Sequence, residues 1–235
     1  LFSWGPFNHT GVRADFTFGN GFVGKLAVMN PTDIVEFNPV NTMTLGAQIG
    51  KTGDKGGIWL NFLYGDQDGT LDEDGPSFDD DGELLSSAGS LFQADVTAGW
   101  NLTDKFYLGV NASIQSVAPG EAFSAPGVIN DLDGDASSFS GIALYPKLTL
   151  SENFALGLRA EYFSIKNGHL GIIGLDDNGD GSVMEFTLSG NYKVGGFTFI
   201  PEFRIDTTSE DSFADKDGEA STLMPSLLMA AVYKF

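Results

Sequence analysis

The residues of this sequence that could do chemistry include acids and bases placed two positions apart. In the stretch ENFALGLRAEYFSI, residues 152–165, Arg159 and Glu161 alternate with leucine, alanine and tyrosine. Residues two apart on a β-strand point to the same face, so this period predicts a strand with one apolar and one charged face. An arginine and a carboxylate on one face indicate either a functional site or simply a face of the sheet that is in contact with water.

A second group of candidates consists of carboxylates that recur at alternate positions around a glycine. Calcium takes six to eight oxygen ligands, and side chains at i, i+2 and i+4 can supply several of them. The best candidates are Asp176, Asn178 and Asp180, followed by Asp131, Asp133 and Asp135. DDNGDGSVMEFT is not an EF-hand loop, because Thr187 stands at position 12 and Glu185 at position 10. Asp, Asn and Gly also form ordinary solvated turns, so calcium and a simple turn remain open interpretations.

The sequence offers no constellation for catalysis. It contains no cysteine and two histidines, His9 and His169, neither of which has the neighbours of a base oriented by a third group. We therefore assign no catalytic residue and expect that the protein is not an enzyme.

The charge of the chain is strongly negative and unevenly placed. The 32 acidic residues outnumber the 12 basic ones, which gives a net charge of −20. No basic stripe is present, so a nucleic-acid partner is not expected. Nine of the acidic residues lie in 66–83, and others gather in 130–135, 176–180 and 206–219. The acid therefore concentrates between the periodic segments rather than within them.

Eleven segments alternate as β-strands do, and helical periodicity is nearly absent. They are 10–18, 22–30, 41–50, 57–65, 89–101, 105–117, 138–150, 153–166, 182–194, 197–208 and 223–235. The connections alternate between short and long. The short ones are 19–21, 51–56, 102–105, 151–153 and 195–196, and the long ones are 31–40, 66–88, 118–137, 167–181 and 209–222.

This alternation of loop lengths indicates the fold class. Outer-membrane barrels have short turns at one end and longer loops at the other, whereas a Greek-key sandwich has no reason to do so. No run approaches 18 apolar residues, so a transmembrane helix is not predicted. We predict an all-β fold, an antiparallel transmembrane β-barrel in which residues 1–235 form one domain. A soluble β-sandwich is the alternative, but it leaves the loop lengths unexplained.

Aromatic residues recur beside the short connections, as in the girdle of a membrane barrel. They include Phe16, Phe18, Phe22, Trp100, Phe106, Phe154 and Phe197. The last segment carries an apolar face that runs to the chain end through Tyr233 and Phe235. It resembles the C-terminal strand by which outer-membrane barrels are recognised for assembly.

If the apolar faces meet lipid, the opposite faces line the interior. The charged residues on those faces are Arg13, Asp15, Lys25, Asp95, Lys147, Arg159, Glu161, Glu185, Lys193, Glu202, Arg204 and Asp206. Both signs occur in near balance, so a strongly selective anion pore, which needs a ring of one sign, is not expected. Cross-strand pairs of Arg159 or Glu161 with Lys147, Lys193 or Glu185 are expected instead.

Several stretches resemble the putative β-barrel porin-2 (OmpL-like) family, which is typical of Bacteroidota-type outer membranes. They are PFNHTGVRADFTF, GIALYPKLTLSENFALGLRAEYF, FTLSGNYKVGGFTFIPEFRIDTTS and the closing AAVYKF. In the family, the stretch like PFNHTG stands after several earlier strands. Counting back from a periplasmic Phe235 also places the start of 10–18 on the extracellular side. We therefore expect further strands to precede Leu1.

The resemblance implies a protein of the bacterial outer membrane and carries no catalytic residues. We expect a porin that passes small solutes through a lumen of mixed charge, beneath acidic extracellular loops. The alternative is a structural or accessory barrel in a larger envelope complex. The expected partners are outer-membrane lipids and, in the alternative, other envelope proteins. No cofactor is expected apart from calcium in the loops.

Overall fold

The structure is a computed structural model that describes residues 8–32, 35, 43–65, 91–117, 136–168 and 173–235. The described residues form strands and no helix. The strands are β1 (Gly11–Gly19), β2 (Phe22–Met29), β3 (Thr44–Gly53), β4 (Gly56–Gly65), β5 (Leu91–Asn101), β6 (Phe106–Val117), β7 (Ser137–Ser151), β8 (Phe154–Lys166), β9 (Gly181–Val194), β10 (Phe197–Thr208), β11 (Phe213–Ala214), β12 (Ala220–Ser221) and β13 (Leu223–Tyr233).

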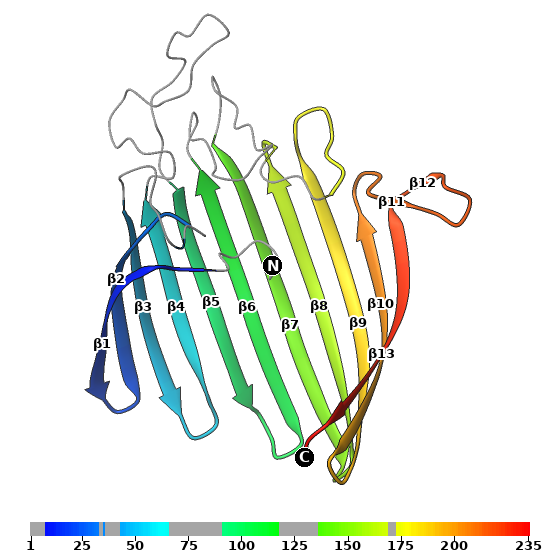
Figure 1. The fold of residues 1–235 in the computed structure, drawn as a ribbon, viewed down its shortest axis with the longest axis horizontal. Helices are drawn as coiled ribbons and strands as arrows, with labels where there is room; N and C mark the ends of the chain where they lie inside the picture. The colour runs from blue at the N-terminus through cyan, green and yellow to red at the C-terminus, as the bar shows by residue number, and fades with distance from the viewer. Residues whose placement is uncertain (1–7, 33–34, 36–42, 66–90, 118–135, 169–172) are drawn as a thin grey trace, which may run out of the picture.

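Eleven of the strands form one antiparallel sheet in which sequence neighbours pair, in the order β1 to β10 followed by β13 (Figure 1). The all-β antiparallel fold and the eleven predicted segments are confirmed. Three strands differ from the prediction by more than one residue at an end: β3 begins at Thr44 and ends at Gly53 rather than at 41 and 50, β5 begins at Leu91 rather than at 89, and β13 ends at Tyr233 rather than at 235. The ribbon of β11 and β12, inside the connection 209–222, was not predicted because strands of two residues are too short to show a period.

The short connections all lie at one end of the sheet, opposite the strand ends from which the long connections leave (Figure 1). The turn between β1 and β2 shows why they can be so short. Asn20 and Gly21 both have positive φ values, 51° and 79°. Such values match the twist of a tight hairpin and are accessible to asparagine and glycine.

The two faces of the sheet differ in chemistry along nearly every strand. Side chains that are register partners share a face, and the face of Phe203, Leu188 and Leu158 is apolar and exposed. Leu158 is 40% exposed and Leu188 is 50% exposed. A soluble sandwich would bury these side chains in a closed core, so their exposure fits a sheet whose apolar face meets lipid. We call this the outer face and the opposite one the inner face.

The predicted aromatic girdle lies on this outer face. Phe16 and Phe18 stack with ring centres 6.1 Å apart, and the ammonium of Lys51 lies 4.7 Å from the ring centre of Phe22. Phe154 and Phe199 flank Tyr192 in register on neighbouring strands. These rings gather beside the short turns, where the bilayer surface would lie.

Strand β13 departs from the alternation because it is apolar on both faces. Its outer residues Leu227 and Met229 are 70% and 71% exposed. Its inner residues Met224, Leu228 and Val232 are also apolar and exposed. The sequence indicated only the outer stripe, because its aromatic end dominated the pattern.

A small apolar core interrupts the inner face near the long connections. Phe139, Phe163 and Ile165 are buried there, and the rings of Phe139 and Phe163 have centres 5.3 Å apart. Ile173 and Leu175, from the connection between β8 and β9, pack against them. Among the described residues, no helix is long and apolar enough to cross a membrane.

Candidate functional site

All twelve charged residues that the sequence assigned to the interior lie on the inner face. Register pairing shows this directly, as in the row that runs from Asp15 through Lys25, Gln48 and Asn61 to Asp95. Six of the twelve are basic and six are acidic. They are not spread evenly, because the paired ones gather in two groups on opposite halves of the sheet.

The first group is a row of three carboxylates across neighbouring strands. Glu161 on β8, Glu185 on β9 and Asp206 on β10 are register partners. They are 8%, 3% and 3% exposed. Like charges so close together repel one another, so the row requires neighbouring cations. We call these residues the carboxylate row.

Two arginines supply those cations from the next row toward the short turns. Arg159 Nη2 lies 2.5 Å from Glu161 Oε2, and its Nε lies 2.9 Å from Glu185 Oε2. Only the contact with Glu161 has hydrogen-bond geometry, so the contact with Glu185 is an ion pair. Arg204 donates two bonds of 2.7 Å to Asp206. The five side chains carry a net charge of −1, because three carboxylates face two guanidinium groups.

A threonine and a tyrosine complete this group. The Thr187 hydroxyl, in register with both Arg159 and Arg204, donates a hydrogen bond to Glu185. The guanidinium carbon of Arg159 lies 6.0 Å from the centre of the Tyr145 ring. The expected pairing of Arg159 with Glu185 is thus present. The sequence did not indicate Thr187 or Tyr145, because their roles follow from register.

The second group is a network of amides around Asp95 on β5. Asp95 accepts hydrogen bonds from the amides of Asn61 at 2.8 Å and Asn111 at 2.6 Å. It also accepts one from the Thr97 hydroxyl at 3.1 Å. Gln48 extends the network by donating to Asn61 at 2.5 Å. Sequence reasoning found only Asp95, because uncharged amides carry no distinctive signal until cross-strand neighbours are known.

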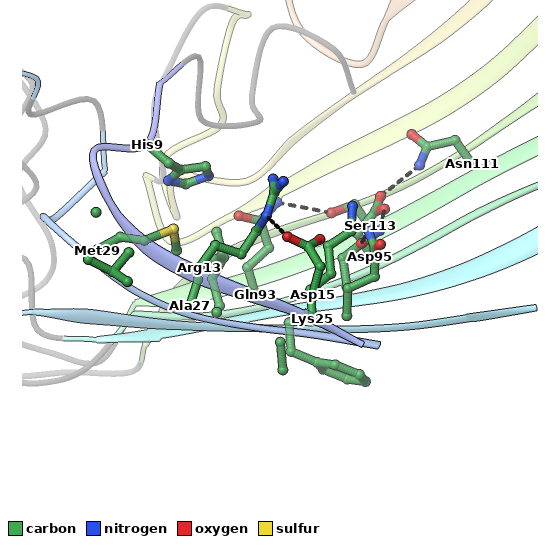
Figure 2. A pocket seen from close by; sticks show the side chains of 18 residues that line it. His9, Arg13, Asp15, Lys25, Ala27, Met29, Gln93, Asp95, Asn111 and Ser113 are labelled. Carbon is green, nitrogen blue, oxygen red and sulfur yellow. Dashed lines mark hydrogen bonds and ion pairs between the residues drawn. The ribbon is translucent and has the colours of Figure 1, made fainter. Parts of the chain in front are cut away.

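A cavity of about 830 Å³ lies over this network, beneath β1. Figure 2 shows Arg13 and Asp15 on β1 facing the same space as Asp95 and Asn111 on the wall. Arg13 Nε and Asp15 Oδ2 are 3.0 Å apart, and both side chains are more than half exposed. The cavity is therefore lined by acids, bases and amides together with apolar side chains such as Met29 and Leu63, and it is open to water.

The remaining predicted interior charges lie nearer to the short turns. Lys147 is the register partner of Tyr107, and Glu202 is the partner of Ser189. Lys193 is the partner of Thr198. They continue the polar inner face below the carboxylate row.

The first candidate calcium stretch forms a tight turn that is closed by its own hydrogen bonds. Asp176 Oδ1 accepts the backbone N–H of Asn178 at 2.8 Å and of Asp180 at 2.9 Å. The N–H bonds from Asp180 and then Asn178 hold the pKa of Asp176 below its ordinary value. Asp180 itself forms an ion pair with Lys166.

The same turn occurs a second time in residues 215–219. Asp215 Oδ1 accepts the N–H of Asp217 at 2.8 Å and of Glu219 at 2.9 Å. In both turns the fourth residue is a glycine with positive φ, Gly179 at 76° and Gly218 at 83°. The shared pattern is Asp, any residue, Asp or Asn, Gly, then Asp or Glu, which indicates a structural reason for part of the acid in the connections.

Calcium binding stays a prediction. In the described part of the chain, no group of three or more acidic or histidine side chains is arranged to hold a metal ion. The second candidates, Asp131, Asp133 and Asp135, lie outside the described residues, as does His169.

The predicted assembly signal lies at the end of the outer face. Tyr233 is the register partner of Phe197, beside the short turns, and is 67% exposed. Phe235 follows the last strand and is fully exposed. Its role in assembly stays a prediction.

An antiparallel sheet with an apolar outer face, a polar inner face and all its short turns at one end defines a porin-type outer-membrane β-barrel. Comparison with known proteins agrees. The sequence model of the putative β-barrel porin-2, OmpL-like family matches residues 1–235, and the chain belongs to this family. The protein is therefore located in the bacterial outer membrane.

Solved structures with a similar fold are outer-membrane proteins. The channel DcaP of Acinetobacter baumannii matches with a TM-score of 0.61 at 12% identity, over 94% of this chain and 61% of that one. OmpT of Vibrio cholerae matches with a TM-score of 0.56 at 12% identity, over 95% of this chain and 64% of that one. The chain thus spans less than two thirds of either protein. No curated protein matches the sequence.

Proposed function

We propose that this chain forms part of the wall of a passive, non-enzymatic channel for small polar solutes. The observation that carries the proposal is the inner face, which presents charged and amide side chains opposite a lipid-facing apolar surface. Family membership supports the same function.

The charge balance of the inner face favours a water-filled interior over a dry one. The carboxylate row and its two arginines bring five charged side chains together on one part of the inner face. Taking so many charges out of water is costly in a dry interior, whereas water in a lumen solvates them. The side chains of Arg159 and Arg204 are 30% and 36% exposed, so water in a lumen can solvate both guanidinium groups.

Acidic long connections at one mouth would give the channel a mild preference for cations. A concentration of one sign of charge at an entrance raises the local concentration of the opposite ion. The inner face, with six charges of each sign, adds no strong preference of its own.

The alternative is an accessory barrel that holds partner proteins at its long connections. One observation favours it, the folded projection formed by the ribbon of β11 and β12 (Figure 1). Ser212 in this projection accepts a hydrogen bond of 2.8 Å from the Gly174 amide, which ties two connections together. A preformed surface of this kind suits docking.

Conductance of the full-length protein in a planar bilayer tests the proposal. We expect discrete current steps that scale with salt concentration. The absence of current at every salt concentration would overturn the channel, and co-purification of stoichiometric envelope proteins would then favour the accessory role. Heat-modifiable migration in detergent confirms that the protein used is folded.

A further inference from the structure

The inner face contains a floor of glycines between β4 and β7. Gly57, Gly99 and Gly109 are register partners on three successive strands, and Tyr145 follows them on β7. Without side chains, these positions leave bare backbone against which an aromatic ring can lie flat.

Trp59 covers the first part of this glycine floor. A Cβ atom at Gly57 would lie 2.8 Å from Trp59 Cη2 and 3.2 Å from Cζ2. A Cβ atom at Gly50, across the ladder, would overlap the five-membered ring of the same indole. Both ends of the indole therefore rest on the wall.

Tyr107 covers the rest of the glycine floor. A Cβ atom at Gly109 would lie 3.2 Å from Tyr107 Cε1, and one at Gly99 would overlap the Tyr107 hydroxyl. The same position at Gly109 lies 3.2 Å from Tyr145 Cβ. Tyr107 and Tyr145 each keep 36% of their surface exposed.

These three rings form one strip around the inner wall. Trp59 Cη2 lies against Gly57 and the Tyr107 hydroxyl lies against Gly99, its register partner, so the near edges of the two rings lie on neighbouring strands. Tyr145 follows, and Arg159 lies over Tyr145 at 6.0 Å. We call Trp59, Tyr107 and Tyr145 the aromatic strip.

We propose that the aromatic strip is a binding track for neutral saccharides, which deepens the proposed channel function and rests on it. One face of a pyranose ring is lined by C–H groups and stacks on an aromatic face, while its hydroxyls need hydrogen-bond partners. Lys147 beside Tyr107 and Arg159 beside Tyr145 supply donors.

Local charge selects a neutral ligand over an ionic one. A cationic solute would be repelled by Arg159, which lies over the face of Tyr145. An anionic solute would be repelled by the carboxylate row. A neutral polyhydroxylated ring is repelled by neither and can accept hydrogen bonds from Lys147 and Arg159.

The competing explanation is that the rings only stabilise the sheet by covering its glycines, a known role of aromatic side chains in β-structure. Maltotriose and a poly(ethylene glycol) of the same mass separate the two explanations. They block a pore by size alike, but only the saccharide has stacking faces.

We expect maltotriose to interrupt the current through the full-length channel at lower concentration than the poly(ethylene glycol). Tyr107→Leu should weaken this block about 2- to 10-fold, the range expected for losing one ring contact. Tyr107→Phe keeps the ring and should retain the block. Equal block by the two solutes, or a block that Tyr107→Leu leaves unchanged, would overturn the saccharide track.

Tryptophan fluorescence tests the same site without relying on conduction. Maltotriose should change the emission of the detergent-folded protein, and Trp59→Phe should abolish the change. Trp100→Phe is the matched control, because Trp100 lies on the outer face and its loss should leave the response intact. A fluorescence response without current would overturn the channel function and support the saccharide site. Current without discrimination between the two solutes would support the channel function and overturn the saccharide site.

Discussion

At the scale of single residues, Arg159 is the side chain on which most of the inner-face electrostatics depends. It contacts Glu161 at 2.5 Å, Glu185 at 2.9 Å and the ring of Tyr145. The two carboxylates are only 8% and 4% exposed at the side chain, whereas the arginine is 30% exposed. Removing it would leave adjacent, nearly buried negative charges.

Replacing Arg159 with methionine is therefore expected to destabilise the barrel by about 1–3 kcal/mol. The value lies at the low end for a broken buried ion pair because water reaches part of this site. Urea unfolding of the protein in detergent or lipid measures the change. The folded fraction at each urea concentration is read from heat-modifiable migration on a gel. The matched control is Arg13→Met, whose pair with Asp15 is more than half exposed and should shift stability by less than about 0.5 kcal/mol.

Asp95 supports a second prediction at this scale. Asn61, Thr97 and Asn111 all donate to it, so Asp95→Ala would leave several donors without their acceptor. We expect a loss of about 1–3 kcal/mol in the same unfolding measurement. Asp95→Asn keeps an acceptor oxygen and should lose less. Equal effects of the two substitutions would show that charge, rather than the hydrogen bonds, matters here.

At the scale of elements, the turn at 176–180 recurs at 215–219, and its hydrogen bonds are a feature that the residue types did not indicate. In each turn two backbone amides donate to the first aspartate, while calcium binding at 176–180 stays a prediction. Residue types alone do not indicate that an aspartate carboxylate accepts hydrogen bonds from main-chain N–H groups. This arrangement requires the local backbone path, which the glycine with positive φ sets.

The Asp176 turn should loosen on acidification. Its N–H bonds lower the pKa of Asp176, so they stabilise the turn above the ordinary aspartate pKa. That contribution is lost as the pH falls through the lowered pKa. The amide resonances of Asn178 and Asp180 should follow this titration, and Asp176→Asn should remove it. A titration that persists in Asp176→Asn would assign the effect to another group.

The strands support a further prediction, which concerns register. One alanine inserted between Thr187 and Leu188 would reverse the faces of one half of β9 relative to the other. It would either expose Glu185 to lipid or bring Leu188 to the inner face. We expect failure of assembly, seen as loss of heat-modifiable migration. The same alanine inserted in the connection 66–90 should be tolerated.

At the scale of the whole molecule, alternation was enough to predict the fold and the faces, because period two is a local property of the chain. Every charged residue assigned to the interior lies on the inner face for this reason. Which inner-face residues lie next to one another could not be predicted in the same way. The carboxylate row and the glycine floor exist only through register across three or more strands, which depends on every turn between them.

The uneven charge of the molecule gives a prediction at this scale. On the proposed function, in which the acidic long connections stand at one mouth, reversal potentials in a salt gradient should show a cation preference that weakens as salt is raised. The Debye screening length falls from about 10 Å at 0.1 M salt to about 3 Å at 1 M salt. High salt therefore shortens the range of the electrostatic field of the acidic connections. A preference unchanged by salt would place its origin in the inner wall instead.

Each strand of the main sheet pairs with its neighbour in the chain, with the ribbon of β11 and β12 as the single detour between β10 and β13. Such an order has a kinetic consequence. Every ladder of the described sheet closes only the loop between its own two strands, so none of these ladders must wait for a distant segment, and the entropy cost of each step stays small. The growing unit is the hairpin, and the sheet can extend one hairpin at a time as the chain enters the membrane.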